Sequence, residues 1–278
     1  MPELPELQAH AERLTTEFGG ARLTAFRPIA FTALKTYAPP PDQAFGHCLV
    51  GVGRRGKYLL LDFGATTFVV HLMQGGRLKP DDKQSAKPRG GLARWVFDDR
   101  RALLLTEAGT EKRAGVWVRD GDLEAQEPIE GLGPDADTLD DATLSAICAA
   151  HSMRLHGMLR DQRALAGIGR RLANEVCHRA RLSPFANASK LKPDEVTRLA
   201  GAIRACLDES LSYERSRDDM SSSRERPGHV HHRAGETCAV CGDTVREVAY
   251  SHYTVNYCAT CQTNGKVLAD NTTSKFLK

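Results

Sequence analysis

Apolar positions recur at two different spacings along this chain, and the change of spacing divides it into segments. The first segment has apolar residues at helical intervals, including Leu7, Ala11 and Leu14. Gly19-Gly20 interrupts this pattern, and glycine favours the end of a helix. We therefore expect a helix over residues 5–18.

After this helix the apolar residues cluster in short runs that are typical of β-strands, with turn residues between them. The runs are residues 58–63, 67–72, 93–97, 102–106 and 116–118. Because no helical pattern separates them, they predict an antiparallel sandwich or barrel. A polar stretch with glycine and proline at 120–137 predicts a linker, so we place an N-terminal domain at residues 1–119.

The second half of the chain has helical spacing. Helices are expected over residues 138–150, 171–180 and 193–211. Residues 214–229 are charged, rich in serine and poor in apolar residues, which predicts a mobile loop. We therefore expect a helical domain over residues 138–228 and a C-terminal segment over 229–278, in an α+β multidomain protein.

The composition is that of a globular protein, with 278 residues of which 41% are hydrophobic and 26% charged. No run of about 18 apolar residues occurs, and the N-terminus begins with charged residues, so we expect neither a membrane span nor a secretion signal. These absences predict a cytoplasmic protein. The net charge of +3 says little about partners, but residues 151–233 have an excess of Lys and Arg, which suits a phosphate-binding surface or a solvated helical face.

The eight cysteines fall into two groups. Four are isolated and are expected to be small buried apolar residues: Cys48, Cys148, Cys177 and Cys206. The other four form two pairs with two residues inside each pair, Cys238 with Cys241 and Cys258 with Cys261. Two such pairs on tight turns can close a tetrahedral site for one structural Zn²⁺, with no position open for water. Two disulfides are the alternative, and a cytosolic location disfavours them.

The N-terminus offers a candidate nucleophile. The chain begins Met1-Pro2-Glu3, and a small second residue normally allows Met1 to be removed. Pro2 would then carry a free secondary amine, and the pKa of an α-amine is about 8, so part of it is neutral at pH 7. A neutral amine can attack an electrophilic sugar carbon and form an iminium, which promotes elimination of the attached phosphate. The alternative is that Pro2 and Pro5 only begin a helix.

Five motifs, in this order along the chain, resemble the formamidopyrimidine-DNA glycosylase / endonuclease VIII family. They are Pro2-Glu3-Leu4-Pro5-Glu6; Gly56-Lys57-Tyr58-Leu59-Leu60; His71-Leu72 with Gly75-Gly76; Asp161-Gln162 before Gly167-Ile168-Gly169; and the four-cysteine segment ending in Cys261-Gln262. The resemblance covers nearly the whole chain. It implies an N-terminal antiparallel β-sandwich with flanking helices, a helix–two-turns–helix domain and a C-terminal four-cysteine zinc finger. It also implies a DNA glycosylase with abasic-site lyase activity, which cleaves by β- and δ-elimination.

The resemblance assigns catalytic roles to four residues. Pro2 is expected to be the Schiff-base nucleophile, and Glu3 the acid that opens the sugar ring and helps the base to leave. Glu6 would orient these groups, unless it is only a favourable charge at a helix N-terminus. Lys57 would bind a phosphate and, if close to the amine, oppose its protonation. Without the resemblance, a lysine at the start of a strand would be unremarkable.

The resemblance also implies contacts with DNA. His71 is expected to contact DNA, and Gln74 aligns with the residue that fills the space left by a flipped base. A second filling position lies near Arg113, where Ala114 stands in place of an aromatic residue of the family. Arg170 stands where the family usually has an asparagine that contacts phosphate, and it precedes an expected helix whose N-terminus suits a phosphate. An ordinary connection between helices is the alternative for that segment.

Three departures from the family bear on the substrate. The segment 214–228 is short for the loop that caps 8-oxoguanine, and His156 replaces a lysine of the purine-specific members. Both departures favour the endonuclease VIII side and oxidised pyrimidines. Tyr253 stands where the family has a phosphate-binding arginine in the finger, and His252 or Lys266 is the expected substitute.

The leading hypothesis is therefore a monomeric bacterial repair enzyme that acts in the cytoplasm at the nucleoid, on double-stranded DNA with damaged bases or abasic sites. An 8-oxoguanine or formamidopyrimidine glycosylase is the alternative within the enzyme class. A catalytically weak protein that binds DNA damage is the alternative from another class, and Tyr253, Ala114 and Arg170 motivate it. A zinc-ribbon regulator would explain the cysteines but not the N-terminal motif.

Overall fold

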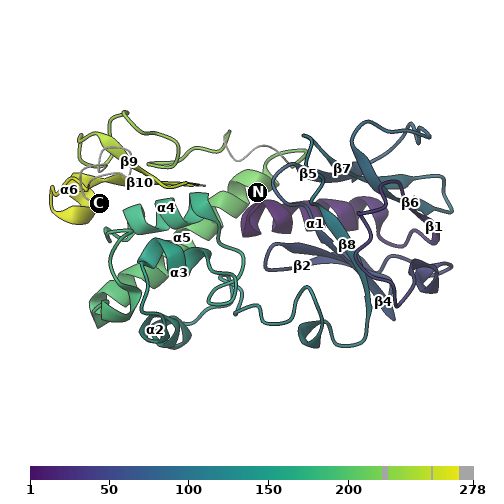
Figure 1. The fold of residues 1–278 in the computed structure, drawn as a ribbon, viewed down its shortest axis with the longest axis horizontal. Coiled ribbons are helices and arrows are strands. Elements are labelled where there is room, and N and C mark those ends of the chain that lie inside the picture. Colours follow the sequence, from purple (N-terminus) through teal and green to yellow (C-terminus); the bar gives the residue numbers. More distant parts are fainter. Residues whose placement is uncertain (221–224, 252, 269–278) are drawn as a thin grey trace. The chain divides into compact units, whose positions relative to one another are not determined.

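The computed structural model describes residues 1–220, 225–251 and 253–268. The chain forms two compact units (Figure 1). The first contains Met1–Gly131 together with Arg217–Met220, and the second contains Leu132–Ser216 and Ser221–Lys278. The units therefore divide inside the stretch 120–137, and the helical segment shares one unit with the cysteine-rich segment.

The first unit contains two four-stranded sheets whose neighbouring strands are antiparallel. One sheet has the order β1 (Leu23–Pro28), β6 (Gly91–Phe97), β7 (Ala102–Glu107), β5 (Gly76–Pro80). The other has the order β2 (Gly51–Arg55), β3 (Tyr58–Asp62), β4 (Thr66–His71), β8 (Gly115–Asp120). Two short 3₁₀ turns lie at Pro41–Ala44 and Leu123–Ala125. The expected antiparallel sandwich is confirmed.

A single apolar core lies between the sheets and a covering helix. Phe68 on β4 and Trp95 on β6 join the two sheets, with ring centroids 5.7 Å apart. Helix α1 (Leu4–Phe18) adds its apolar face to this core, and Phe18 packs 5.3 Å from Phe97 on β6. The helical spacing of the sequence therefore predicted the buried face of α1 correctly.

Hydrogen bonds tie α1 to an edge strand of each sheet. The hydroxyl of Thr15 donates to the carbonyl of Val52 on β2 at 3.2 Å and accepts the amide of the same residue at 2.8 Å. One turn earlier, Nε2 of His10 is 2.7 Å from the carbonyl of Leu78 on β5 and donates to it. Strands β2 and β5 are each an edge strand, so α1 covers one edge of each sheet.

The second unit is helical, with a small hairpin near its C-terminus. Its elements are α2 (Asp141–Ala150), α3 (Leu155–Arg160), α4 (Arg170–Arg179), a 3₁₀ turn (Ala188–Lys190), α5 (Pro193–Arg215), β9 (Val245–Ala249), β10 (Thr254–Cys258) and α6 (Ala259–Thr263). The antiparallel hairpin β9–β10 precedes α6. Among the described residues, no helix is both long and apolar enough to span a bilayer.

The expectation of a mobile loop over 214–229 is wrong for much of that segment. Glu214 belongs to α5 and is fully buried, and it forms an ion pair at 3.3 Å with Arg226, which is also buried. Met220 packs into the core of the first unit. The charged composition suggested solvation, whereas tertiary contacts pair two of the charges and bury the methionine. Residues 221–224 lie outside the described part of the chain.

We expect His10→Gln to reduce the acid sensitivity of the first unit. Burial is the main cause that lowers the pKa of His10 from 6.5 to about 4. The unfolded chain therefore takes up a proton as the pH falls from 6.5 towards 4, whereas the folded chain does not, so stability present above pH 6.5 is progressively lost. Glutamine can still donate to Leu78 but does not titrate.

The measurement is urea unfolding followed by tryptophan fluorescence, because Trp95 and Trp117 both lie in the first unit. Between pH 7 and pH 5, the wild-type protein should lose about 2 kcal/mol more than His10→Gln, since one pKa unit corresponds to about 1.4 kcal/mol. Equal losses in the two proteins would show that His10 is not the group responsible.

Candidate active site and metal centre

The first turn of α1 holds two buried carboxyl groups beside Pro2. Glu3 is the N-cap residue, with extended backbone, and its side chain is 5% exposed. Its amide donates to Oε2 of Glu6 at 3.2 Å, and Glu6 is 1% exposed. Pro2 itself is half-buried. The motif at the start of the chain thus becomes a compact group in which a helix N-terminus, rich in N–H donors, stabilises acidic side chains.

Lys57 lies in the same unit, on the tight turn between β2 and β3. Arg55 and Tyr58 are paired across these strands, so the turn consists of Gly56 and Lys57 alone. Gly56 has a φ of 55°, a left-handed conformation that glycine adopts without strain. Lys57 is only 9% exposed, unlike an ordinary lysine on a hairpin. Its ammonium is therefore held close to the protein.

The pKa of His71, at the end of β4, indicates which of these groups lie close together. Its pKa is lowered from 6.5 to about 4, first by burial and then by repulsion from Lys57 and from the N-terminal amine. Such repulsion acts over short range, so the amine, Lys57 and His71 share one neighbourhood. The imidazole is neutral at pH 7, and its Nδ1 lies 3.2 Å from the amide of Met73, which donates to it. The remaining proton is therefore on Nε2.

Gln74 projects from the turn that follows His71. Its side chain is exposed, and the preceding Met73 has a left-handed φ of 51°, which is uncommon for a residue with a side chain. The carbonyl of Gly75 accepts the amide of Ala108 at 3.3 Å. The Gln74 turn and the loop after β7 are therefore neighbours, as two loops that enter DNA together would be.

The loop that carries Arg113 is organised by a buried carboxylate that the sequence motifs did not indicate. Oε2 of Glu107 accepts the amides of Arg113 at 2.7 Å and Ala114 at 2.8 Å. The guanidinium of Arg113 is exposed and pairs with Glu111 at 2.7 Å, whereas Ala114 is buried in the core. The methyl group of Ala114 therefore cannot be inserted into DNA, and Arg113 is the projecting residue of this loop. The position of Glu107, at the end of an apolar strand, was the available signal.

Arg170 is the first residue of α4, in the second unit. Gly169 caps this helix, and the N–H groups of its first turn are the kind that bind phosphate. Arg170 is half-buried, and Arg171 beside it turns inward, where it donates to the carbonyls of Arg226 and Pro227. Of the two arginines, only Arg170 is placed at the helix terminus with partial exposure.

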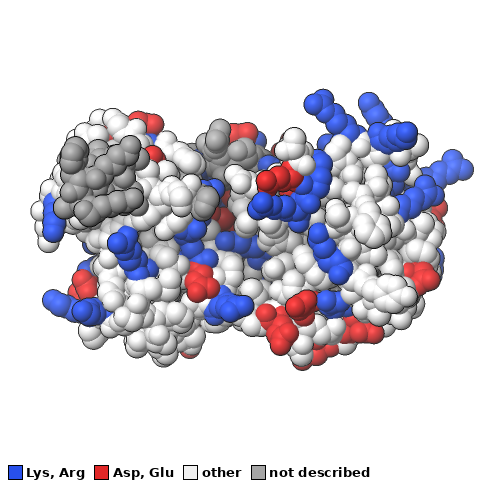
Figure 2. Space-filling model, in the orientation of Figure 1, with Lys and Arg blue, Asp and Glu red and all other residues white. Residues whose placement is uncertain are grey.

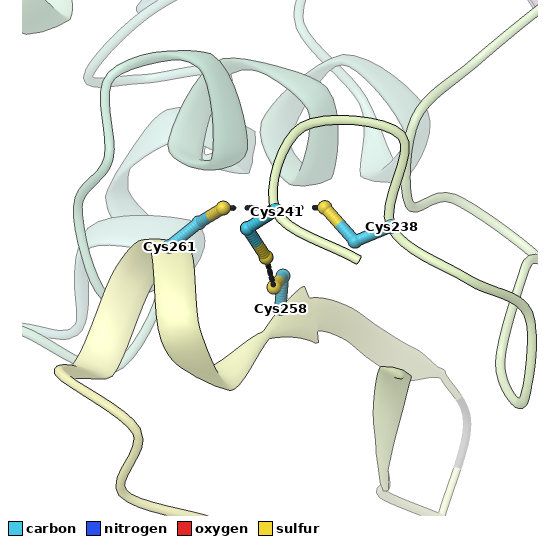
Figure 3. Close-up of side chains that lie close together, drawn as sticks. All are labelled: Cys238, Cys241, Cys258 and Cys261. Carbon is cyan, nitrogen blue, oxygen red and sulfur yellow. Dashed lines mark hydrogen bonds between the residues drawn. The ribbon is translucent and has the colours of Figure 1, made fainter. Parts of the chain in front are cut away.

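The four clustered cysteines converge on one point (Figure 3). Their Sγ atoms all lie within 4.8 Å of one another, with Cys238 and Cys261 3.9 Å apart and Cys241 and Cys258 3.3 Å apart. A disulfide requires about 2.05 Å, so these pairs are not disulfides. A tetrahedral metal with sulfur ligands at about 2.3 Å places its ligands roughly 3.8 Å apart. The geometry and the all-thiol donor set fit a metal site.

Helix α4 anchors this metal site. Nε2 of His178 on α4 lies 3.4 Å from Sγ of Cys238. The carboxylate of Glu175, one turn earlier, accepts the amides of three successive residues that lead into the finger, His229, Val230 and His231. The finger is therefore continuous in structure with α4.

The expected DNA-binding residue Lys266 is exposed on the turn after α6.

Comparison with known proteins identifies the family. The family model described as Formamidopyrimidine-DNA glycosylase N-terminal domain matches residues 1–111, and that of the H2TH domain matches residues 131–222. The chain belongs to the formamidopyrimidine-DNA glycosylase family. H2TH denotes the helix–two-turns–helix domain, so the α+β fold class expected from the motifs is confirmed.

Relatives in this family align along nearly the whole chain. The formamidopyrimidine-DNA glycosylase of Thiobacillus denitrificans is 31% identical over 274 residues, which are 94% of this chain and 100% of the relative. That of Chloroflexus aurantiacus is 28% identical over 272 residues, or 94% of this chain and 98% of the relative. An uncharacterized formamidopyrimidine-DNA glycosylase-like protein of Mycobacterium tuberculosis is 40% identical over 149 residues, but these are only 53% of this chain and 94% of the relative.

Solved structures share the fold at low sequence identity. A complex of Lactococcus lactis Fpg with DNA containing an abasic site has a TM-score of 0.80 and 18% identity, covering 94% of this chain and 99% of that one. MutM in complex with DNA containing carbocyclic 8-oxo-G has a TM-score of 0.81 and 18% identity, covering 94% and 100%. At this identity the likeness shows that the fold is shared.

We expect Cys258→Ser to abolish metal binding and to destabilise the finger, while the sandwich keeps its stability. All four thiols lie in one short segment, and the sandwich has a core of its own. Metal analysis should find one zinc per wild-type chain and none in the variant, with unchanged unfolding by tryptophan fluorescence. Cys148→Ser, a buried cysteine on α2 outside the site, is the control and should keep its metal. A wild-type chain without metal would contradict the assignment.

Proposed function

We propose that this protein is a DNA glycosylase with abasic-site lyase activity, that Pro2 supplies the nucleophilic amine and that the thiol site holds zinc. One observation carries the proposal: Lys57 and the amine at the start of the chain, which in this structure belongs to Met1, both act on His71, and the helix that follows Pro2 begins with the buried Glu3. Few structural roles require an amine, a lysine and a neutral histidine together. Complexes of family members with damaged DNA support duplex DNA as the partner.

The reaction begins with the amine. Once Met1 is removed, the nitrogen of Pro2 is a secondary amine, and part of it is neutral at pH 7 because the pKa of an α-amine is about 8. The neutral nitrogen attacks C1′ of the damaged nucleotide, the glycosidic bond breaks and the base leaves with a proton. Glu3, held as the N-cap of α1, donates a proton to the sugar oxygen as the ring opens. The product is an iminium that joins Pro2 to C1′.

The iminium then promotes strand cleavage. It acidifies the hydrogen on C2′, and loss of that proton expels the phosphate from C3′, which is the β-elimination step. A second elimination expels the phosphate from C5′, and hydrolysis of the iminium returns the free amine. Lys57 and the Nε2 proton of His71 are suited to bind the backbone phosphates beside the sugar.

The other proposed DNA contacts lie on exposed segments of both units. Gln74 and Arg113 project from neighbouring loops of the first unit and would fill the space that a flipped base leaves. Arg170, at the N-terminus of α4, would bind phosphate, and Lys266 is a further candidate on the exposed turn after α6. Lys and Arg side chains are spread over both units on the face drawn in Figure 2, as a contact with a long polyanion would require.

Oxidised pyrimidines are the proposed substrates. The segment before the finger has little free length for a cap over 8-oxoguanine, because Glu214, Met220 and Arg226 are all buried. His156 is 3% exposed and neutral, so it cannot present a positive charge as a lysine would. The second candidate is a formamidopyrimidine or 8-oxoguanine glycosylase, and the names of the relatives favour it.

We expect Pro2→Gly to reduce covalent trapping on an abasic duplex by borohydride at least tenfold. Borohydride reduces the iminium to a stable adduct, so trapping measures the amine directly. A chain that retains Met1 should lose trapping too, because its Pro2 nitrogen is then an amide. Undiminished trapping in either protein would refute the Pro2 nucleophile, and a wild-type chain that binds lesions without trapping would be a damage-binding protein.

Glu3→Gln serves as the matched comparison within the same turn. Departure of a base requires the acid that opens the sugar ring, whereas a preformed abasic site has already lost its base and its ring opens without the enzyme. The variant should therefore lose excision of a damaged base more severely than cleavage of the abasic duplex. Equal losses on the two substrates would contradict this division of roles.

For the substrate, we expect thymine glycol or dihydrouracil to be excised faster than 8-oxoguanine opposite cytosine, by roughly one to two powers of ten. Each lost hydrogen bond to the purine costs about 1–3 kcal/mol, and about 1.4 kcal/mol corresponds to a tenfold rate. Single-turnover kinetics on duplexes of identical sequence measure the ratio. Faster release of 8-oxoguanine would place the enzyme with the purine-specific members.

A further inference from the structure

Three aromatic rings are stacked where the β9–β10 hairpin meets α3. Tyr250 and Tyr253 lie on either side of the hairpin turn, with ring centroids 4.7 Å apart and planes 14° from parallel. The amide of Tyr250 donates to the carbonyl of Tyr253 at 2.8 Å, which closes the turn. His156 of α3 continues the stack, 6.1 Å from Tyr253 and 12° from parallel. Position 252, inside this turn, lies outside the described residues, so the expectation for His252 has no structural counterpart.

Two arginines of the same helical segment contact these rings. The guanidinium carbon of Arg160, the last residue of α3, lies 4.2 Å from the centroid of the Tyr253 ring. Arg154, the N-cap residue of α3, donates a hydrogen bond to the hydroxyl of Tyr250 and lies over the ring of Phe185 at 5.7 Å. A ring orients a guanidinium through its flat face.

The histidine of the stack adds no charge at neutral pH. The pKa of His156 is lowered to about 3, mainly by burial and further by Arg160 and Arg170. Those two arginines are therefore close enough to oppose its protonation, and the cluster is positive because of its guanidinium groups alone. It contains the exposed edge of the hairpin, the end of α3 and the beginning of α4, all within the second unit.

We propose that Arg160, positioned by the ring of Tyr253, is the residue of this unit that binds a DNA phosphate next to the hairpin. The proposal rests on the proposed function, since it requires DNA as the partner. An arginine fork with a fixed plane suits the two oxygens of a phosphate, and half-buried stacking lowers the conformational entropy lost on binding. The hairpin thus contributes an aromatic support, and α3 contributes the charge.

The first test measures binding to a duplex that carries a tetrahydrofuran abasic analogue, at several salt concentrations. Arg160→Ala should weaken binding at least tenfold, and the slope of log K against log salt should fall by about 0.9, the value for one phosphate contact. Arg160→Lys should keep the slope, because the charge remains, but should bind less tightly because an ammonium cannot stack as a flat fork does. Arg198→Ala, which removes an exposed arginine paired with Asp194 on α5, is the control and should change neither quantity.

The second test is a double-mutant cycle between Arg160 and Tyr253. Tyr253→Phe keeps the ring and should bind as the wild type does, whereas Tyr253→Leu should weaken binding severalfold. In the Arg160→Ala background, Tyr253→Leu should have little further effect, since the positioned group is already absent. Zinc content and melting temperature verify that each variant is folded.

The outcomes separate this inference from the proposed function. A wild-type chain that neither binds the abasic duplex nor traps with borohydride would overturn the proposed function. If the wild type binds and traps, an Arg160→Ala variant with an unchanged salt slope would overturn the phosphate contact, even if its affinity fell. Fully additive effects of the two substitutions would overturn the positioning role of Tyr253.

Discussion

The attachment of α1 to both sheets is the constraint on which the candidate active site depends. Chain termini are usually frayed, and a reactive terminal amine is useful only if its position is fixed. Here Thr15 bonds to β2 and His10 to β5, while Phe18 packs against β6. The helix is therefore held along its length, and Pro2 lies directly before its first turn. The sandwich therefore supports the segment that carries the proposed nucleophile, Pro2.

The charged groups around this position affect the protonation state of His71. Burial lowers the pKa of His71, and repulsion from Lys57 and from the amine at the start of the chain lowers it further. Lys57 is buried on a two-residue turn, so it cannot move far into solvent. His71 remains neutral, with its Nδ1 occupied by Met73, which leaves one oriented N–H donor.

Helix α4 has the corresponding role in the second unit. Its N-terminus presents Arg170, its middle contributes the Glu175 carboxylate that receives three backbone amides, and its last turn places His178 beside Cys238. The metal site is therefore connected through one helix to the residues that would contact DNA. The hairpin that the metal site stabilises also carries Tyr253, the support of Arg160.

The sequence by itself determined the features that depend on local spacing. The buried face of α1, strands β3, β4, β6, β7 and β8, and the convergence of the four cysteines all follow from short-range patterns that the structure confirms. Strands β1, β2 and β5 and helix α3 were not predicted, because their segments are short and have weak or mixed apolar periodicity. Strands β1 and β5 also pair with strands that do not neighbour them in the sequence, β6 and β7.

Only the tertiary structure decided which distant residues meet. The amine, Lys57 and His71 come from three segments, and no spacing in the sequence relates them. The buried pair of Glu214 and Arg226 reversed the expectation of a mobile loop, since composition cannot reveal that two charges will neutralise each other out of water. The stacking of Arg160 on Tyr253 joins α3 to the hairpin across more than ninety residues, and such a contact exists only once the chain has folded.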